Sequence, residues 1–318
     1  IIRTRNGNYN LGTKKGYMYE RSSIDDSTYT FIADDMAIDD SLGLGEFRGN
    51  VVYKSKDTLG FDLLANNIKT DKKKSALLAT ELPLLLIKQT KDTLYVSADT
   101  LYSGKVSDLK RPFPNARDSV GKMTDSTLDK YFEAFHHVQV YSDSLQAKCD
   151  SLFYALSDST IRLISRPIVW ANNNQITGDT IYMYVQNKKP EQLNVFNNAL
   201  AINKIDTTEY YNQIKGSRLN AWFTDGELIK MRCKGNAENI YFAMDNDKNF
   251  VGVNHSNAQI IEITFENSEP AKVIFRNQLK GTLTPIQKTN KTDLKLNGFK
   301  WLENLRPKSK FDILSPKL

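Results

Sequence analysis

Residues 143–185 read DSLQAKCDSLFYALSDSTIRLISRPIVWANNNQITGDTIYMYV. Apolar and polar residues alternate within short segments, and clusters of Asp, Asn, Ser and Gly separate those segments. An alternation with a period of two is typical of strands with one buried face, and such polar clusters are typical of turns. The stretch therefore predicts a series of short antiparallel strands.

One unit recurs along the chain: an aspartate, then Ser or Thr, then Leu or Ile. It stands at Asp99-Thr100-Leu101, Asp150-Ser151-Leu152 and Asp179-Thr180-Ile181. Side chains of Asp, Ser and Thr bond nearby backbone amides, so the unit predicts a corner or bulge after which the next apolar residue re-enters the core. A second unit, Gly49-Asn50 and Gly235-Asn236, places a glycine that tolerates positive φ before a strand. Such repetition predicts an all-β fold of stacked strand rungs that bury one continuous interior.

The composition limits the range of partners. The chain holds 43 basic and 37 acidic residues, a formal net charge of +6. This mild excess permits an anionic partner, but no helix-turn-helix, zinc-finger or RNP-like motif is present, so we expect no nucleic acid partner. No apolar run reaches the roughly 18 residues of a membrane helix. The start at Ile1 without Met indicates a mature or trimmed chain.

Motifs for catalysis or metal binding are missing from the sequence. Cys149 and Cys233 form no CxxC pair and are expected as small buried hydrophobes, with a disulfide between them left open. His136 and His137 are adjacent, so in a strand they point to opposite faces and cannot bind one metal ion. Because no nucleophile, phosphate-binding or metalloprotease motif appears, we expect no enzymatic activity, no catalytic residue, no cofactor and no metal.

Two regions interrupt the strand pattern. Residues 107–137 are expected to form an inserted loop with one short helix near 126–132. Residues 286–318 form a basic tail, which either docks on the body or binds a partner. The expected organisation is an N-terminal β half over 1–106, this insertion, a C-terminal β half over 138–285, and the tail. The tail residues spaced as one apolar face of a short helix before Pro307 are Leu294, Leu296, Phe299, Trp301, Leu302 and Leu305.

The ordered series of these units resembles the OstA-like family of Gram-negative bacteria. That family comprises periplasmic lipopolysaccharide-transport proteins and the N-terminal domain of the outer-membrane lipopolysaccharide assembly protein. The order and spacing of the units are most similar to those of the long family members from the Bacteroidetes group. The residues that carry the resemblance are Phe47-Arg48-Gly49-Asn50-Val51, Ser97-Ala98-Asp99-Thr100-Leu101, the run 143–184, Gly235-Asn236-Ala237-Glu238 and Gly298-Phe299-Lys300-Trp301-Leu302.

The resemblance implies an open β-jellyroll, folded like a taco, whose rungs of antiparallel strands enclose a V-shaped apolar trough. It implies that the trough holds the acyl chains of lipid A while the sugars face solvent, in a periplasmic protein that binds and transports lipopolysaccharide to the outer membrane. It also implies docking to other transport proteins of the same β-jellyroll type. Open strand edges recruit further strands, so we expect such docking, and self-association, through the first and last rungs.

One face of each strand points into the expected trough, because a strand alternates its faces. The alternative is that these rows fill a closed core. A second function also stays open, an extracytoplasmic carbohydrate-binding or glycoside-hydrolase-like β protein in which Trp170, Trp222 or Trp301 stacks on sugars instead of packing the fold. The residues expected to line the trough and bind the ligand are Leu152, Tyr154, Leu156, Ile161, Leu163, Ile181, Met183, Val185, Leu219, Ala221, Phe223, Ile240, Phe242 and Met244.

Overall fold

The computed structural model describes residues 1–56, 61–88, 93–109, 129–186, 189–206, 208–225, 227–245, 247, 249–266, 269–289 and 294–314. These residues form antiparallel strands with very little helix, which confirms the prediction of an all-β fold. The chain divides into two compact units. Unit 1 comprises Ile1–Asp143, Lys148–Thr160 and Pro307–Leu318, and unit 2 comprises Ser144–Ala147 and Ile161–Arg306.

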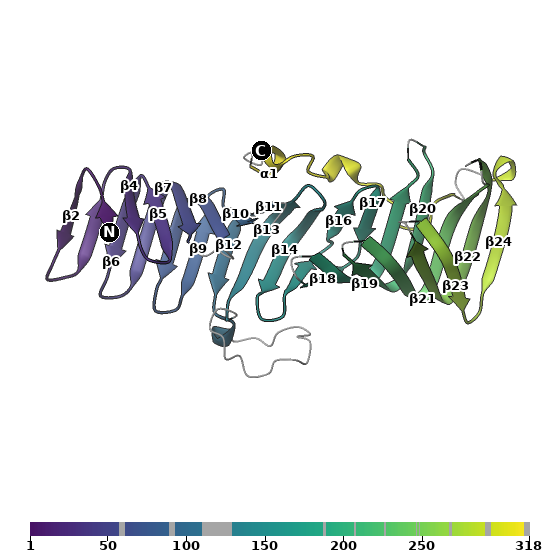
Figure 1. Cartoon of the computed structure of the whole chain (residues 1–318), viewed down its shortest axis with the longest axis horizontal. Coiled ribbons are helices and arrows are strands. Elements are labelled where there is room, and N and C mark those ends of the chain that lie inside the picture. The colour runs from purple at the N-terminus through teal and green to yellow at the C-terminus, as the bar shows by residue number, and fades with distance from the viewer. Residues whose placement is uncertain are drawn as a thin grey trace. The chain divides into compact units, whose positions relative to one another are not determined.

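Within each unit, each strand pairs antiparallel with strands that lie close to it in the sequence (Figure 1). The strands in or entering unit 1 are β1 (Ile2–Arg3), β2 (Gly7–Asn10), β3 (Lys15–Met18), β4 (Ser22–Asp25), β5 (Tyr29–Ala33), β6 (Asp35–Asp39), β7 (Leu44–Ser55), β8 (Phe61–Asp71), β9 (Ala76–Thr80), β10 (Leu84–Lys88), β11 (Thr93–Ser97), β12 (Thr100–Gly104), β13 (Tyr131–Tyr141) and β14 (Gln146–Ala155). Those of unit 2 are β15 (Thr160–Ile164), β16 (Ile168–Ala171), β17 (Asn174–Thr177), β18 (Thr180–Gln186), β19 (Lys189–Lys204), β20 (Tyr211–Thr224), β21 (Glu227–Met244), β22 (Phe250–Glu266), β23 (Glu269–Arg276) and β24 (Lys280–Pro285).

The long strands of unit 1 bend in the middle, so that the sheet folds into two layers. We call layer A the succession β2, β3, β6, the first half of β7, the second half of β8, β9, β12 and the first half of β13. Layer B is the succession β1, β4, β5, the second half of β7, the first half of β8, β10, β11 and the second half of β13. The layers face each other: the ring of Phe31 in layer B stacks on Phe47 in layer A at 4.1 Å.

Unit 2 repeats this arrangement. Its layer A contains β18, the first half of β19, the second half of β20, the first half of β21, the second half of β22, and β23. Its layer B contains β16, β17, the second half of β19, the first half of β20, the second half of β21, the first half of β22, and β24. Thus each long strand contributes one half to layer A and the other half to layer B.

A repeated hydrogen-bond pattern bends the strands. The amide N–H of Asp99 donates to the carbonyls of both Phe135 and His136, at 3.2 and 3.0 Å. The amide of Asp179 donates in the same way to the carbonyls of Phe196 and Asn197, both at 3.2 Å. Each aspartate therefore sits opposite an extra residue in the next strand, and this β-bulge produces the corner. The aspartate unit was predicted to bulge its own segment through its side chain, but its backbone amide holds a bulge in the neighbouring strand.

The aspartate side chains continue the pattern across the corner. Asp99 Oδ2 lies 2.7 Å from His137 Nδ1, and Asp150 Oδ1 lies 3.1 Å from His136 Nδ1. Both histidines have positive φ, so they sit in the bulge instead of in a regular strand, where they were expected to point to opposite faces. In unit 2, Asn198 donates to the carboxylate of Asp179 at 3.1 Å. The conspicuous histidine pair thus belongs to the corner.

The predicted insertion is shorter than expected and contains no described helix at the expected place. β13 begins at Tyr131 and pairs with β12, so residues 131–137 belong to the strand ladder. A 3-10 turn at Val106–Asp108 follows β12. The expected helix near 126–132 falls on residues 126–128, which lie outside the described residues, and on residues 129–132, which are bend and strand.

The tail differs from the predicted amphipathic helix. Residues 294–306 run as a largely extended segment past β20 and β17 (Figure 1), with a turn at 297–298 and a 3-10 turn at Glu303–Leu305. Gln213 donates to the carbonyl of Leu294 and accepts from the amide of Leu296, both at 2.8 Å. Gln175 does the same with Lys300 and Leu302, both at 2.7 Å. Each buried glutamine amide replaces a missing strand partner, which explains why the segment is extended.

The side chains of this segment cover the outer face of layer B in unit 2. Leu296 packs in a buried cluster with Ile240, Phe242 and Val253. The rings of Phe299 and Trp301 contact Tyr211 at centroid distances of 5.2 and 5.4 Å. The helix α1 (Lys310–Leu314) comes after Pro307, not before it, and lies beside β11 and β13 in unit 1. The tail is therefore a docked part of the fold.

Gly235→Ala tests the close packing at a corner. Gly235 has φ of +80°, and a Cβ there would stand 2.6 Å from Ser217 Oγ. We expect the free energy of unfolding, measured with urea, to fall by about 2–3 kcal/mol, because backbone strain and a steric clash add. Gly298→Ala is the matched control, because its φ is +87° but nothing lies within 4 Å. A loss of about 1 kcal/mol is expected there. Equal losses would contradict a packed corner.

Gln175→Leu and Gln213→Leu test the docking of the tail. In Gln175→Leu we expect amide hydrogen exchange of Leu302 to accelerate about tenfold or more while that of Leu296 is unchanged, because only the partner of Leu302 is lost. Gln213→Leu should give the reverse pattern. Mass spectrometry or NMR of the exchanging amides measures both. Unchanged protection of both amides in both variants would show that the glutamines do not hold the segment.

Candidate functional site

The interior between the two layers is the candidate site. In unit 2 the register places Ile181 opposite Val195 and Val195 opposite Leu219, in one transverse row. Met183, Leu193 and Ala221 form the next row. Directly opposed residues share a face, so these side chains form a continuous apolar surface on the inner side of layer A. Gly216 at the corner points at Cys233 on this surface, which fixes it as the inner one.

Exposure along the interior strands rises with distance from the corner. In β18, Ile181 is fully buried, Met183 is 6% exposed and Val185 is partly exposed. In β20, Leu219 and Ala221 are fully buried and Phe223 is partly exposed. The interior is therefore packed at the corner and more accessible towards the far ends of the strands. We call that accessible side the lip.

The predicted residues of the middle of the chain follow the same trend. Leu152 is buried, whereas Tyr154 and Leu156 in and after β14 are partly exposed, and burial raises the pKa of Tyr154. β15 runs in the opposite direction, so here Ile161 is partly exposed and Leu163 is buried. Leu152, Tyr154 and Leu156 belong to unit 1, and Ile161 and Leu163 belong to unit 2. Both rows have the alternation expected of residues that share one face.

The last predicted row lies on the other face. In β21, Ile240 and Phe242 are 1% exposed, but they pack against Leu296 of the tail on the outer side of layer B. Met244 is on the same side and is 38% exposed. Asn239 and Tyr241 alternate with this row and lie an even number of residues from the inward-facing Cys233, so they face the interior instead. The prediction of this row as interior lining is corrected accordingly.

Sequence reasoning missed a polar ladder on the inner side of layer B in unit 2. Asn174, Asn203 and Asn212 lie directly opposite one another in neighbouring strands. Asn203 donates to Asn174 Oδ1 at 3.0 Å, and Asn212 Oδ1 accepts from the amide of Phe242 at 2.9 Å. All three are near the lip and at least partly exposed. The two inner walls therefore differ in unit 2: layer A is apolar and layer B carries amides.

The titratable residues outside the interior form no second candidate site in the part of the chain that the structure describes. Cys149 and Cys233 are buried and form no disulfide, and burial raises the pKa of the Cys233 thiol to about 12, so it does not act as a thiolate near neutral pH. No cluster of three or more His, Cys, Asp or Glu suited to a metal ion occurs in the part of the chain that the structure describes. Among the same residues, no helix is long and apolar enough to span a membrane.

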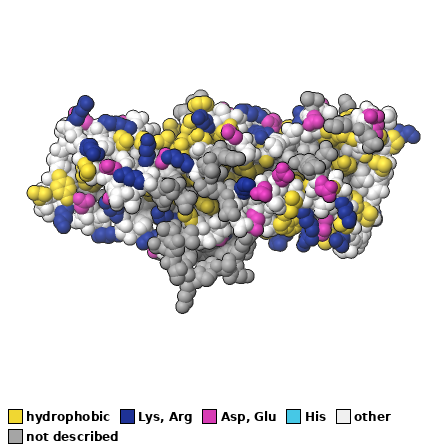
Figure 2. Space-filling model, in the orientation of Figure 1, with side chains coloured by type: hydrophobic (Ala, Val, Ile, Leu, Met, Phe, Trp, Pro, Cys, Tyr) yellow, Lys and Arg dark blue, Asp and Glu magenta, His cyan; other side chains and the backbone are white. Residues whose placement is uncertain are grey.

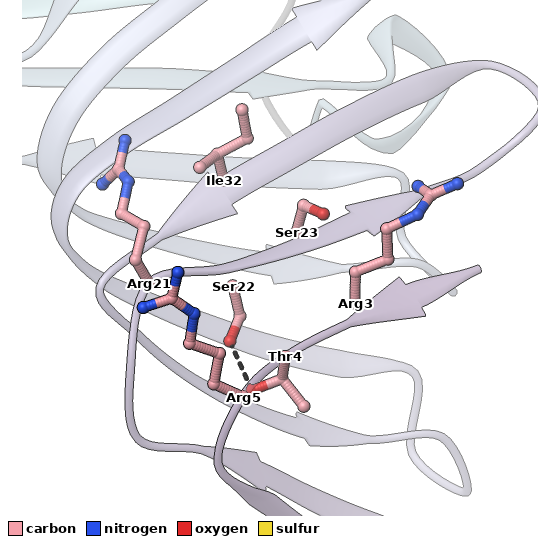
Figure 3. Close-up of a pocket in the computed structure, with 7 residues that line it drawn as sticks. All are labelled: Arg3, Thr4, Arg5, Arg21, Ser22, Ser23 and Ile32. Carbon is pink, nitrogen blue, oxygen red and sulfur yellow. Dashed lines mark hydrogen bonds between the residues drawn. The ribbon is translucent and has the colours of Figure 1, made fainter.

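A pocket of about 350 Å³ lies at the outer side of the first rungs of unit 1 (Figure 3). Its lining includes Arg3, Arg5 and Arg21, but Arg3 points away from the other two (Figure 3). Arg21 is already paired with Asp34 at 2.9 Å. The hydroxyl of Ser22 donates to Thr4 Oγ1 at 2.7 Å. The three guanidinium groups do not converge on one point, so we assign no anion site here.

Taken together, the layers, corners and interior define a class of protein: a ladder of antiparallel strands folded over an apolar interior. No protein-family model matches the chain, and no curated protein matches it. Among solved structures, one similar chain is LptH, the LptA homologous periplasmic component of the lipopolysaccharide transport device from Pseudomonas aeruginosa. The similarity covers 53% of this chain and 81% of LptH, at 16% identity and a TM-score of 0.22. A likeness of this degree assigns neither a ligand nor a partner.

Proposed function

We propose that this chain binds the acyl chains of lipopolysaccharide, or of a related glycolipid, between its two layers and acts as a periplasmic component of glycolipid transport to the outer membrane. The observation that carries the proposal is the gradient of exposure from the packed corner to the accessible lip. Each methylene group of an acyl chain gains about 0.8 kcal/mol when it leaves water for an apolar surface. Several chains inserted at the lip are therefore held without any catalytic group.

The asymmetry of the inner walls in unit 2 suits an amphipathic ligand. Acyl chains would lie on the apolar rows of layer A, which end at Val185 and Phe223 near the lip. The amides of Asn174, Asn203 and Asn212 on layer B offer donors and acceptors to the amide and ester groups that join acyl chains to sugars. This pairing orients the ligand with its sugars outward, because burying sugar hydroxyl groups without partners is costly.

Transport also requires that ligand can pass between molecules, and the terminal strands supply a route. β24 pairs on one side with β22, and β23 also pairs with β22, so both lie at the end of the ladder of unit 2. Leu283 in β24 is 62% exposed and Val273 in β23 is 41% exposed. We propose that these strands dock to a similar β-jellyroll, or to a second copy, by strand addition.

Photo-crosslinking tests the ligand and its location. The residue p-benzoylphenylalanine would replace Phe223 or Tyr154, which we propose line the interior, or Tyr95, which lies on the outer face of layer B in unit 1 opposite Leu86. We expect lipid A to be crosslinked at the first two positions and not at Tyr95. Mass spectrometry of lipids extracted from the purified protein identifies the natural ligand. Equal crosslinking at all three positions, or no crosslinking at any of them, would contradict the proposal.

Leu283→Lys tests docking through the last rung. A charge at this exposed end opposes the approach of another apolar rung, so we expect self-association, measured by sedimentation over a range of concentrations, to weaken about tenfold. Leu279→Lys is the control, because Leu279 is similarly exposed at 55% but precedes the strand. A wild-type chain that stays monomeric at every concentration would contradict self-association, and equal effects of the two variants would contradict this surface.

A further inference from the structure

The outer face of layer A in unit 2 carries a regular array of cations. Directly opposed positions place Arg218 beside Lys234, Arg232 beside Glu262, and Lys230 beside Trp222. Lys272 and Arg276 of β23 continue the array across β22. We call this surface the outer grid; its cations are Arg218, Lys230, Arg232, Lys234, Lys272 and Arg276.

The grid has a net positive charge, because its six cations outnumber the carboxylates of Glu227, Glu262 and Glu266, which the register places on the same face. Glu262 is 7% exposed and lies 2.8 Å from Arg232, 3.5 Å from Arg276 and 3.7 Å from Lys230. Burial disfavours the charged carboxylate, but the three cations outweigh this, so the pKa of Glu262 lies below its ordinary value. Figure 2 shows Lys and Arg side chains, with Asp and Glu side chains among them, at the lower right of the view, where β21 to β23 lie in Figure 1.

An aromatic ring and three amides stand beside these cations. Lys230 Nζ and Arg232 Cζ each lie 5.7 Å from the ring centroid of Trp222. Asn194 Oδ1 accepts hydrogen bonds from Gln192 at 2.8 Å and from Asn220 at 2.6 Å, and Gln192 is directly opposite Trp222. The amides are thus fixed in position before any ligand arrives, which lowers the entropic cost of binding.

We propose that the outer grid binds an anionic saccharide, a sugar chain that carries phosphate or carboxylate groups. The indole of Trp222 offers a flat apolar surface for the C–H face of a sugar ring. The amides of Gln192, Asn194 and Asn220 match hydroxyl groups, and the cations match phosphate or carboxylate. Charge complementarity selects the anionic ligand, because the six cations outnumber the carboxylates on this face.

A lipid surface and a nucleic acid are the competing polyanions. Trp222 is partly buried and two cations of β21 lie over its ring, so it does not protrude as an apolar anchor for a membrane would. Nucleic acids bind chiefly through their phosphates, which would leave the fixed amides without a role. Asn220 and Leu219 point to opposite faces of β20, so this surface is separate from the interior that binds acyl chains in the proposed function.

Titration calorimetry of the full chain at low and high salt tests the inference. The probes are hexagalacturonate, a bisphosphorylated glucosamine disaccharide and the uncharged maltohexaose. We expect one or both anionic probes to bind and maltohexaose not to bind. Tighter binding of hexagalacturonate would indicate that the natural saccharide carries carboxylates, and tighter binding of the bisphosphorylated disaccharide would indicate that it carries phosphates. Trp222→Ala should weaken binding about tenfold, whereas Trp222→Phe should largely preserve it because the ring remains.

Charge variants complete the design. Lys234 and Lys272 are exposed and have no ion pair among the described residues, so the double variant Lys234→Gln/Lys272→Gln should fold normally, weaken binding about fivefold and reduce its salt dependence. Lys280→Gln, an exposed cation of β24 outside the grid, should change nothing.

Three results would overturn the inference, and none of them bears on crosslinking of lipid in the interior. The first is the absence of binding by both anionic sugars, or equal binding of maltohexaose. The second is binding of a dT6 oligonucleotide as tight as that of the sugars together with no effect of Trp222→Ala, which would show a non-specific polyanion surface. The third is binding of vesicles of anionic phospholipid by a chain that binds neither anionic sugar.

Discussion

The double hydrogen bond from an aspartate amide at the corner is the constraint on which the rest of the fold depends. By facing two carbonyls, Asp99 and Asp179 each force one extra residue into the neighbouring strand. Because every long strand bends at the same level, the two halves stack into layers instead of drifting into a twisted sheet. In the strand that carries the extra residue the alternation continues across the corner, so that Cys233 and Asn239 of β21 both face inward. A packed corner on one side leaves the opposite side of the interior more accessible.

Local patterns in the sequence were sufficient to predict this ladder. The recurring aspartate units coincide with corners, and period-two alternation predicts Leu219, Ala221 and Phe223 on one face of β20, whose register with β21 shifts between Trp222 and Phe223. The same reasoning failed for Ile240 and Phe242, which lie on the outer face of β21, where the tail buries them. Alternation identifies two faces but does not say which is inner when a distant segment covers the other. The trough-facing role of the remaining rows stays a prediction.

The tail shows a second limit of local reasoning. Its apolar residues are spaced like a helix face, yet residues 294–306 are largely extended because Gln175 and Gln213 satisfy their backbone amides and carbonyls from positions 81 to 127 residues away. A lone glutamine in a strand carries no signal for such a bond. The asparagine ladder was equally hidden, since Asn174, Asn203 and Asn212 become neighbours only through strand pairing. Long-range polar contacts of this kind set both the path of the tail and the polarity of one inner wall.

The tail also explains why the two layers of unit 2 have different outer surfaces. Layer B has an apolar outer face, with Trp170, Ile240 and Phe242 fully or almost fully buried, and docking of the tail removes that face from solvent. Layer A has no such cover from the described tail, and its outer face carries Arg218, Lys234 and their neighbours. An exposed sheet face must be polar to stay soluble, but scattered charges would suffice for that purpose. A net excess of cations around a fixed indole and fixed amides goes beyond solubility, because like charges held close together repel one another. That repulsion is relieved when an anion binds, which is the physical reason to regard the outer grid as a binding surface.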